Sequence, residues 1–103
     1  MTKKKELPFG SIVGILGGGQ LGRMLSLSAS QLGFKTHIYD PEIDAPAKQV
    51  TNLSSTFEYD DIKNLESFAN KVDIITYEFE NVPLETIKFC QKIKSVYPNF
   101  KSL

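Results

Sequence analysis

The segment from Ser11 to Gly22 constrains the fold most, because a short apolar run leads directly into closely spaced glycines. Residues 11–16, Ser-Ile-Val-Gly-Ile-Leu, are apolar and rich in β-branched side chains, which is typical of a buried strand. Gly17-Gly18-Gly19-Gln20-Leu21-Gly22 follows, and apolar residues then recur at helical spacing. The sequence therefore predicts a strand that turns tightly into a helix.

The helix predicted from Gln20 ends near Gly33, since glycine commonly follows the last turn of a helix. The side of this helix that faces the sheet is expected to carry Leu21, Met24, Leu25 and Leu32. Residues 35–39 are predicted to form a second strand, stopped by Asp40-Pro41. A strand, a helix and a strand in this order form a right-handed unit by strong default.

Strands and helices continue to alternate along the rest of the chain, least legibly between Glu42 and Tyr59. The expected elements are a helical turn at 45–50, a strand within 53–57, a helix at 62–72, a strand at 73–77, a helix from Pro83 and a fifth strand at 95–97. The inward residues of the two helices are expected to be Ile62, Leu65, Phe68, Ala69 and Val72, and then Leu84, Ile87 and Cys90. Asp60 or Asp61 is expected to cap the first of them. This order predicts an α/β fold with an open, mainly parallel, Rossmann-like sheet flanked by helices.

Length and charge limit the classes of protein to which the chain can belong. Its 103 residues suffice for one small domain, expected at 11–103 after an N-terminal tail at 1–10. Twelve basic and twelve acidic residues cancel, so no net charge attracts nucleic acid or an anionic membrane. The single cysteine excludes an internal disulfide, and no apolar stretch approaches the roughly 20 residues of a membrane span. A cytoplasmic protein is expected, and the end at Leu103 suggests a piece cut from something longer.

The glycine turn satisfies the dinucleotide-binding pattern, Gly17-x-Gly19-x-x-Gly22, between a strand and a helix. Asp40 lies 18 residues beyond Gly22, at the end of the second predicted strand, where such folds hold a ribose hydroxyl. Taken alone, these features favour a stand-alone NAD-binding domain of an oxidoreductase or a sensor. A third interpretation is a structural or regulatory module without a ligand, in which the glycines only allow close packing.

Two features argue against a nicotinamide cofactor. Gln20, whose amide both donates and accepts hydrogen bonds, lies within the loop, and an acidic cluster that includes Glu78 follows the fourth predicted strand. Ligands of open parallel sheets bind beyond the carboxyl ends of the strands, so Gln20 and Glu78 are expected to face one crevice. A crevice walled by carboxylates suits hydroxyls or an amine and repels a pyrophosphate.

Four motifs carry a resemblance to a known family. Gly-Ile-Leu-Gly-Gly-Gly-Gln-Leu-Gly-Arg-Met at 14–24 resembles the opening signature of the 5-(carboxyamino)imidazole ribonucleotide synthetases of the ATP-grasp superfamily. Three further motifs match in the same order and spacing. They are Tyr39-Asp40-Pro41, Ala45-Pro46-Ala47 and Thr76-Tyr77-Glu78-Phe79-Glu80-Asn81-Val82-Pro83. The resemblance extends from about Ser11 to the end of the chain.

The resemblance implies an enzyme of purine biosynthesis that uses ATP and bicarbonate to carboxylate the amine of 5-aminoimidazole ribonucleotide. It also implies that this chain is the N-terminal domain, which holds the ribonucleotide. ATP and Mg²⁺ are expected to bind in an ATP-grasp domain that the chain lacks, so these residues alone are expected to be inactive. Domains of this kind in the family often take part in dimers, so a homodimer is a further expectation.

The resemblance assigns substrate contacts to the matching positions. Gln20 and the backbone of Leu21 match the contact made by the glycine loop, which includes Gly19, and Glu78 matches the acidic contact. Tyr77, Glu80 and Asn81 are expected either to touch the substrate or to brace the loop. No residue of this chain is expected to be catalytic or to bind a metal.

Several other polar residues are expected to serve structure. Asp40 is interpreted as a turn carboxylate ahead of Pro41 in preference to a ligand contact. His37 is expected to be a structural residue of the second strand, and Cys90 a core residue. Arg23 lies in the first turn of its helix, where the dipole disfavours a cation, which suggests a carboxylate partner across a domain or subunit boundary.

Overall fold

The computed structural model describes residues 7–78 and 81–98. The elements, in chain order, are β1 (Ile12–Leu16), α1 (Gln20–Gln31), β2 (Lys35–Tyr39), η1 (Pro46–Gln49), β3 (Leu53–Ser55), α2 (Ile62–Lys71), β4 (Ile74–Tyr77), α3 (Leu84–Gln91) and β5 (Val96–Tyr97). These are the elements that the sequence predicts, with small differences at their ends. Within the described ranges, no helix is both long and apolar enough to cross a membrane.

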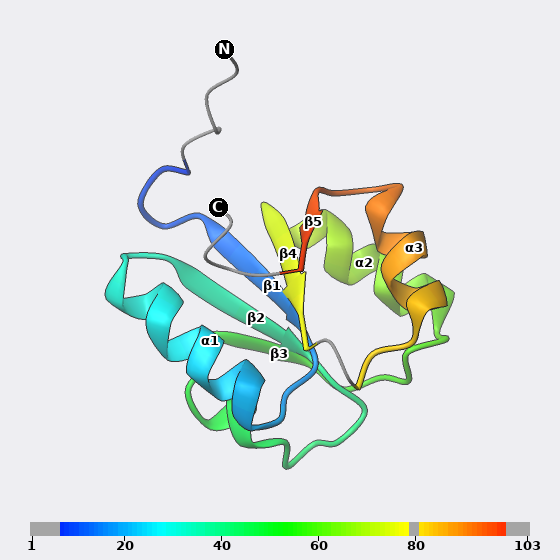
Figure 1. Cartoon of the computed structure of the whole chain (residues 1–103), viewed down its shortest axis with the longest axis horizontal. Helices are drawn as coiled ribbons and strands as arrows, with labels where there is room; N and C mark the ends of the chain where they lie inside the picture. The colour runs from blue at the N-terminus through cyan, green and yellow to red at the C-terminus, as the bar shows by residue number, and fades with distance from the viewer. Residues whose placement is uncertain (1–6, 79–80, 99–103) are drawn as a thin grey trace.

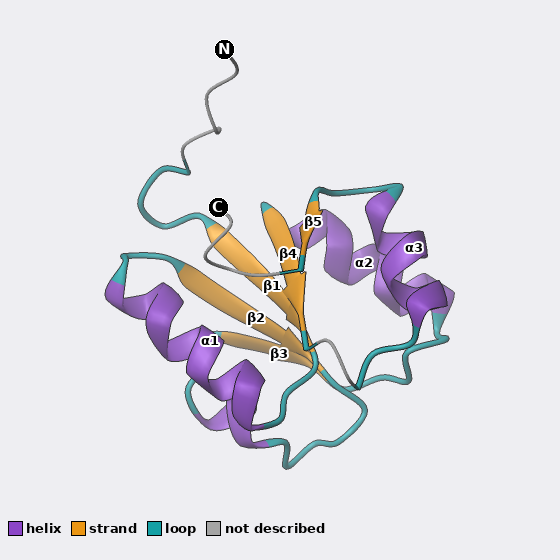
Figure 2. Ribbon diagram, viewed as in Figure 1, coloured by secondary structure: helices purple, strands orange, loops and turns teal. Residues whose placement is uncertain are grey.

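The five strands form one sheet in the order β3-β2-β1-β4-β5, and every pair is parallel. Helix α1 covers one face of the sheet, and α2 and α3 cover the other (Figures 1 and 2). The predicted α/β fold with a parallel sheet is thus confirmed. The chain leaves β1 in one direction to build β2 and β3 and in the other to build β4 and β5, so a switch in strand order lies beside β1.

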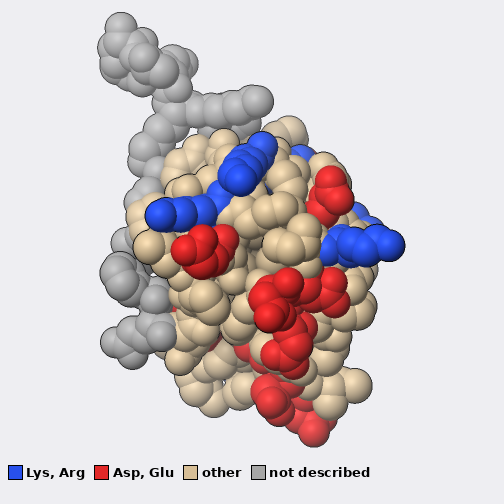
Figure 3. Space-filling model, turned by 90° about the vertical axis from the view of Figure 1, so that its right-hand side faces the viewer, with Lys and Arg blue, Asp and Glu red and all other residues tan. Residues whose placement is uncertain are grey.

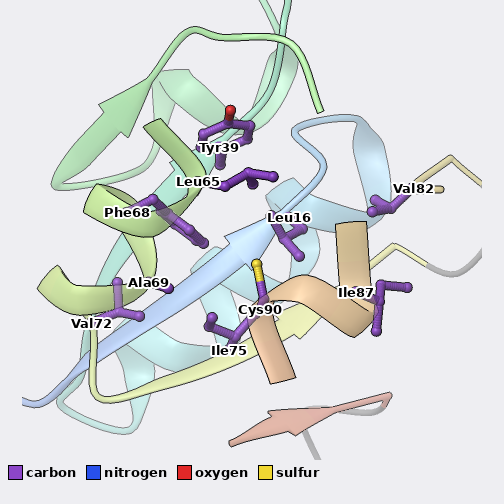
Figure 4. Packing of buried hydrophobic residues seen from close by; sticks show 10 residues of the cluster. All are labelled: Leu16, Tyr39, Leu65, Phe68, Ala69, Val72, Ile75, Val82, Ile87 and Cys90. Carbon is purple, nitrogen blue, oxygen red and sulfur yellow. The ribbon is translucent and has the colours of Figure 1, made fainter. Parts of the chain in front are cut away.

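The face under α2 and α3 is filled by large side chains. They are Leu16, Tyr39, Leu65, Phe68, Ala69, Val72, Ile75, Val82, Ile87 and Cys90 (Figure 4). Gly14 makes room for this packing, because a Cβ there would lie 2.8 Å from the tip of the Phe68 ring. The inward residues predicted for α2 and α3 are buried except Ile62 and Leu84, which are exposed. Each of these two is the first residue of its helix, where the chain is still approaching the sheet.

The face under α1 is packed differently: the sequence prediction is right for Leu25, which packs against the core under this helix, and wrong for Leu21, Met24 and Leu32. Its buried residues are Gly22, Ser26 and Ala29, whereas Leu21 is 46% exposed, Met24 63% and Leu32 57%. Leu25 is half-buried. The reason is close approach: a Cβ on Gly22 would collide with the carbonyl oxygen of Gly17. Only small side chains fit between this helix and the sheet.

Polar contacts hold α1 against the strand beneath it. The Ser26 hydroxyl lies 2.7 Å from that of Thr36, which lies 2.8 Å from the hydroxyl of Thr51. On α2 the cap is Asp61, whose carboxylate accepts a hydrogen bond from the Asn64 amide at 3.2 Å. This contact decides between the two aspartates considered from the sequence.

Acidic side chains gather along one stretch of the side that α2 and α3 present, and Lys and Arg side chains stand apart from one another there (Figure 3). A nucleic acid backbone is bound by clustered cations. In the described part of the chain, this side therefore offers no continuous basic surface to such a ligand.

Candidate functional site at the carboxyl ends of the strands

Three neighbouring strands end in register beside the glycine turn. Leu16 of β1 pairs with Tyr39 of β2 on one side and with Tyr77 of β4 on the other. The next residue of each strand is therefore at the same level: Gly17 in the centre, Asp40 on one side and Glu78 on the other. Two carboxylates flank the turn because the register places them there.

Glu78 fills the space that the glycines leave. Its side chain is 3% exposed; Oε1 accepts a hydrogen bond from the Gly22 amide at 2.9 Å. A Cβ on Gly17 would lie 2.9 Å from Glu78 Cγ, and one on Gly19 or Gly22 would lie 3.1 Å from its Oε1. The three glycines of the dinucleotide pattern thus make room for a carboxylate of the chain itself.

Asp40 holds the opposite side of the turn. Its Oδ2 accepts a hydrogen bond from the Gly18 amide at 2.7 Å and one from the Tyr59 hydroxyl at 3.3 Å. Its Oδ1 accepts from the Glu42 amide at 2.8 Å. Burial and the nearby Asp40 carboxylate raise the pKa of Tyr59 above its ordinary value, so its hydroxyl stays protonated and able to donate. Asp40 is the turn carboxylate that was expected, and it also binds the glycine loop.

Two of the expected substrate contacts lie at the start of α1. Gln20 and Leu21 are exposed there, and Gly19 lies against Glu78. Within the described residues, no hydrogen bond joins the Gln20 side chain to Glu78. The helix start therefore presents Gln20 to its surroundings, while Glu78 lies beneath the loop.

The remaining expected contacts surround Glu78. Tyr77 is half-buried at the end of β4, and Asn81 donates a hydrogen bond from Nδ2 to Glu78 Oε2 at 3.1 Å. That bond corresponds to the bracing role considered for Asn81. Glu80 lies outside the described residues.

Lys48 and Tyr59 support this site, although the sequence did not mark either residue as part of it. Lys48 Nζ donates to the carbonyl oxygens of Asp40 at 2.9 Å and Glu42 at 2.6 Å, and to the Thr56 hydroxyl at 2.7 Å. Desolvation lowers the pKa of Lys48, against the opposing effect of nearby carboxylates. No local pattern marks these two residues, because their partners come from the crossover between β2 and β3 and from the loop after it.

His37 and Cys90 lie where structural residues are expected. His37 is buried, contacts the Ser55 hydroxyl at 2.7 Å through Nε2 and meets the Phe68 ring edge to face at 5.2 Å. Its Nδ1 is buried and has no hydrogen-bond partner among the residues that the structure describes. Desolvation, assisted by Lys71, lowers the pKa of His37 to about 4. Burial raises the pKa of the Cys90 thiol to about 11, so it stays protonated in the core.

Comparison with known proteins decides the family. The family described as the ribonucleotide synthetase pre-ATP-grasp domain matches residues 11–103. The chain belongs to this family. Within 7–78 and 81–98, no group of three His, Cys, Asp or Glu side chains could hold a metal ion in this pre-ATP-grasp domain.

Relatives of this pre-ATP-grasp domain are purine-synthesis proteins. It is 51% identical over 81 residues to an N5-carboxyaminoimidazole ribonucleotide synthase of Brucella melitensis. The matched region is 79% of the chain and 22% of that protein. The domain is 46% identical over 97 residues to the bifunctional purine synthesis protein purC/E of Dictyostelium discoideum. The matched region is 94% of the chain and 10% of that protein. The chain therefore spans less than a quarter of the length of these two relatives.

Solved structures agree on the fold. A synthetase from Staphylococcus aureus, complexed with ADP, has a TM-score of 0.81 and 40% identity over 87% of the chain and 24% of that structure. The ADP complex of another N5-carboxyaminoimidazole ribonucleotide synthetase has a TM-score of 0.82 and 37% identity, with the same coverage. The stand-alone NAD-binding interpretation is not favoured, since the matches are to synthetases. The geometry agrees, because the chain's own carboxylates take the Gly18 and Gly22 amides.

Proposed function

We propose that this chain is the N-terminal domain of an N5-carboxyaminoimidazole ribonucleotide synthetase. Such an enzyme uses ATP and bicarbonate to carboxylate the amine of 5-aminoimidazole ribonucleotide. The family match over residues 11–103 and the printed names of the relatives support this proposal. The ADP in two related structures supports the use of ATP. The enzyme is expected to work in the cytoplasm.

The proposed role of this domain is to hold the ribonucleotide at the carboxyl ends of β1 and β4. Gln20, Gly19 and the Leu21 backbone would contact it from the helix start, with Glu78 beneath and Tyr77 and Asn81 beside it. The observation that supports this most is the seat of Glu78 within the glycine loop. From the described residues, each Glu78 oxygen accepts one hydrogen bond, and a carboxylate oxygen has the capacity for another, which suits a hydroxyl or an amine.

The chemistry divides between this domain and the rest of such an enzyme. ATP converts bicarbonate into a carboxyphosphate, an electrophile that the ribonucleotide amine attacks, with release of phosphate. The part assigned to this domain is positioning. ATP and Mg²⁺ are assigned to an ATP-grasp domain beyond these 103 residues, so the chain alone is expected to hydrolyse no ATP.

The test is a substitution of Glu78 in the enzyme that carries this domain. Glu78→Gln keeps the shape of the side chain and removes its charge. We expect the KM for the ribonucleotide to rise about tenfold, because a charged hydrogen bond is lost, while the KM for ATP changes less than about twofold. Glu85→Gln on exposed α3 is the matched control and should change neither constant. An equal rise of the KM for ATP would contradict the assignment.

We also propose that the domain forms a homodimer through α1. Four large apolar side chains of this helix and its C-terminal cap are exposed: Leu21, Met24, Leu27 and Leu32. Grouped exposed apolar side chains commonly mark an interface.

A further inference from the structure

Asp40 is joined to the glycine loop more closely than a turn carboxylate needs to be. Its contact with the Gly18 amide is 2.7 Å long and links residues 22 positions apart. A carboxylate that accepts from a backbone amide forms one of the stronger hydrogen bonds in proteins. The end of β2 is therefore tied to the turn that follows β1.

Gly18 is held through both of its backbone polar groups, which belong to the peptide units on either side of its Cα. Its amide donates to Asp40, and its carbonyl oxygen accepts from the Ala47 amide at 2.7 Å. A Cβ on Gly18 would lie 2.9 Å from the Cβ of Ala45, so the loop also packs tightly on the crossover that carries Ala45 and Ala47. The motifs around Asp40 and Ala45 thus meet at one residue of the glycine loop, Gly18.

The backbone conformation of Gly17 makes the orientation of Gly18 depend on the hydrogen bond from Asp40. Gly17 has a φ of +102°, in the left-handed region that favours glycine, so the loop turns sharply just before Gly18. Immediately after Gly18 come Gly19, the N-cap of α1, and Gln20, the first residue of the helix. Any rotation of the backbone at Gly18 would therefore change the orientation of Gly19 and Gln20.

The contact between Lys48 and Asp40 leaves the Asp40 carboxylate available to bind the Gly18 amide. Lys48 is engaged with the backbone oxygen of Asp40 and not with its carboxylate, whose donors are the Gly18 amide, the Glu42 amide and the Tyr59 hydroxyl. Three neutral donors from three segments orient the group. The carboxylate charge then strengthens its bond to Gly18.

We propose that Asp40 is a positioning residue of the ribonucleotide site. Through its hydrogen bond with the Gly18 amide, it sets the direction in which Gly19, Gln20 and Leu21 face the ligand. This inference rests on the proposed function. It assigns Asp40 no contact with the substrate. Glu78 supports the loop from the β4 side through Gly22, and Asp40 supports it from the β2 side.

The experiment combines amide NMR of the 103-residue chain with titration of the enzyme that carries this domain by 5-aminoimidazole ribonucleotide. Asp40→Asn keeps the shape of Asp40, and Asp44→Asn removes the same charge from an exposed residue of the same crossover. In the wild type and in the control, we expect the Gly18 amide proton to resonate downfield and to exchange slowly. In Asp40→Asn we expect both properties to be lost, shifts at Gly19 and Gln20, and about tenfold weaker ribonucleotide binding.

Each result has one meaning. An ordinary, fast-exchanging Gly18 amide in the wild type would overturn the proposal, even if Asp40→Asn failed to fold. A folded Asp40→Asn variant with unchanged Gly18 to Gln20 resonances, or with wild-type affinity, would also overturn it. If the wild-type enzyme binds no ribonucleotide, the proposed function fails, and the positioning role at that site fails with it. The Gly18 resonance still decides separately whether Asp40 holds the loop.

Discussion

Helices α1 and α2 cover opposite faces of one sheet by different means. Helix α2 buries Leu65, Phe68 and Ala69, and its large side chains reach across to the sheet. Helix α1 buries only Gly22, Ser26 and Ala29; Leu25 is half-buried, and Leu21, Met24 and Leu27 are exposed. The same rule of apolar periodicity therefore gives the right inward face for α2 and, apart from Leu25, the wrong one for α1.

The difference follows from the two connections that lead into the helices. Only three residues separate the end of β1 from the start of α1, so the first turn of the helix lies directly on the strand and on Glu78. Helix α2 is reached through the longer segment after β3, which allows larger side chains between helix and sheet. The α1 side carries the start of the candidate site, and the α2 side provides most of the large apolar core.

The strongest test of this contrast removes a large side chain from α2. Phe68→Ala should lower the free energy of unfolding by about 3–5 kcal/mol, because the ring fills the space over Gly14 and beside His37. Urea unfolding followed by circular dichroism measures the loss. Ser67→Ala, on the exposed side of the same helix, is the control and should lie within about 0.5 kcal/mol of the wild type. A loss below about 1 kcal/mol would show that the α2 face is not the main core.

The second test uses the pH dependence of the same face. The pKa of His37 is about 4 in the folded chain, below the 6.5 of an unperturbed histidine, so the unfolded chain binds the proton more readily. Stability should thus be unaffected by this group above pH 6.5 and should fall as the pH drops toward 4, by up to about 3 kcal/mol. Urea unfolding of wild type and His37→Gln across this range isolates the effect. Parallel curves for the two proteins would refute the burial argument.

The third test adds one methyl group to the α1 face. Gly22→Ala should destabilise the chain by about 2 kcal/mol, because the Cβ would meet the Gly17 carbonyl oxygen, which is backbone and cannot turn aside. Ser30→Ala, exposed on the same helix, is the control. Differential scanning calorimetry on both variants gives the comparison. A stabilised Gly22→Ala variant would mean that α1 lies farther from the loop than the structure has it.

The fold and part of the site were predictable from local patterns. The strand at 11–16 and the glycine turn after it are marked by composition alone, and the carboxyl-end rule brings Glu78 to that turn. The register of β1 with β4 supplies the physical reason, since it sets Glu78 level with Gly17. These inferences need only the chain order and the geometry of parallel strands.

The packing of α1 and the support of the loop were not predictable in the same way. Periodicity ranks side chains by hydrophobicity, so it selects Leu21 and Met24 and overlooks a buried face made of small residues. The bond from Asp40 to Gly18 depends on how two segments 22 residues apart cross in space. No spacing within either segment encodes that crossing.

The smallest effect on stability is expected on the outer side of α1, and it tests whether this side is an interface. Met24→Glu should change the free energy of unfolding by less than about 0.5 kcal/mol, because the side chain is exposed in the single chain. The same change should weaken self-association, because a carboxylate would be buried between apolar surfaces. Ser30→Glu places the charge on another exposed position of the helix and should leave association unchanged. Sedimentation velocity over a concentration series measures the self-association of both variants. Equal self-association of Met24→Glu and Ser30→Glu would show that α1 is not the dimer contact. In that case the contrast between the helices would be one of packing alone.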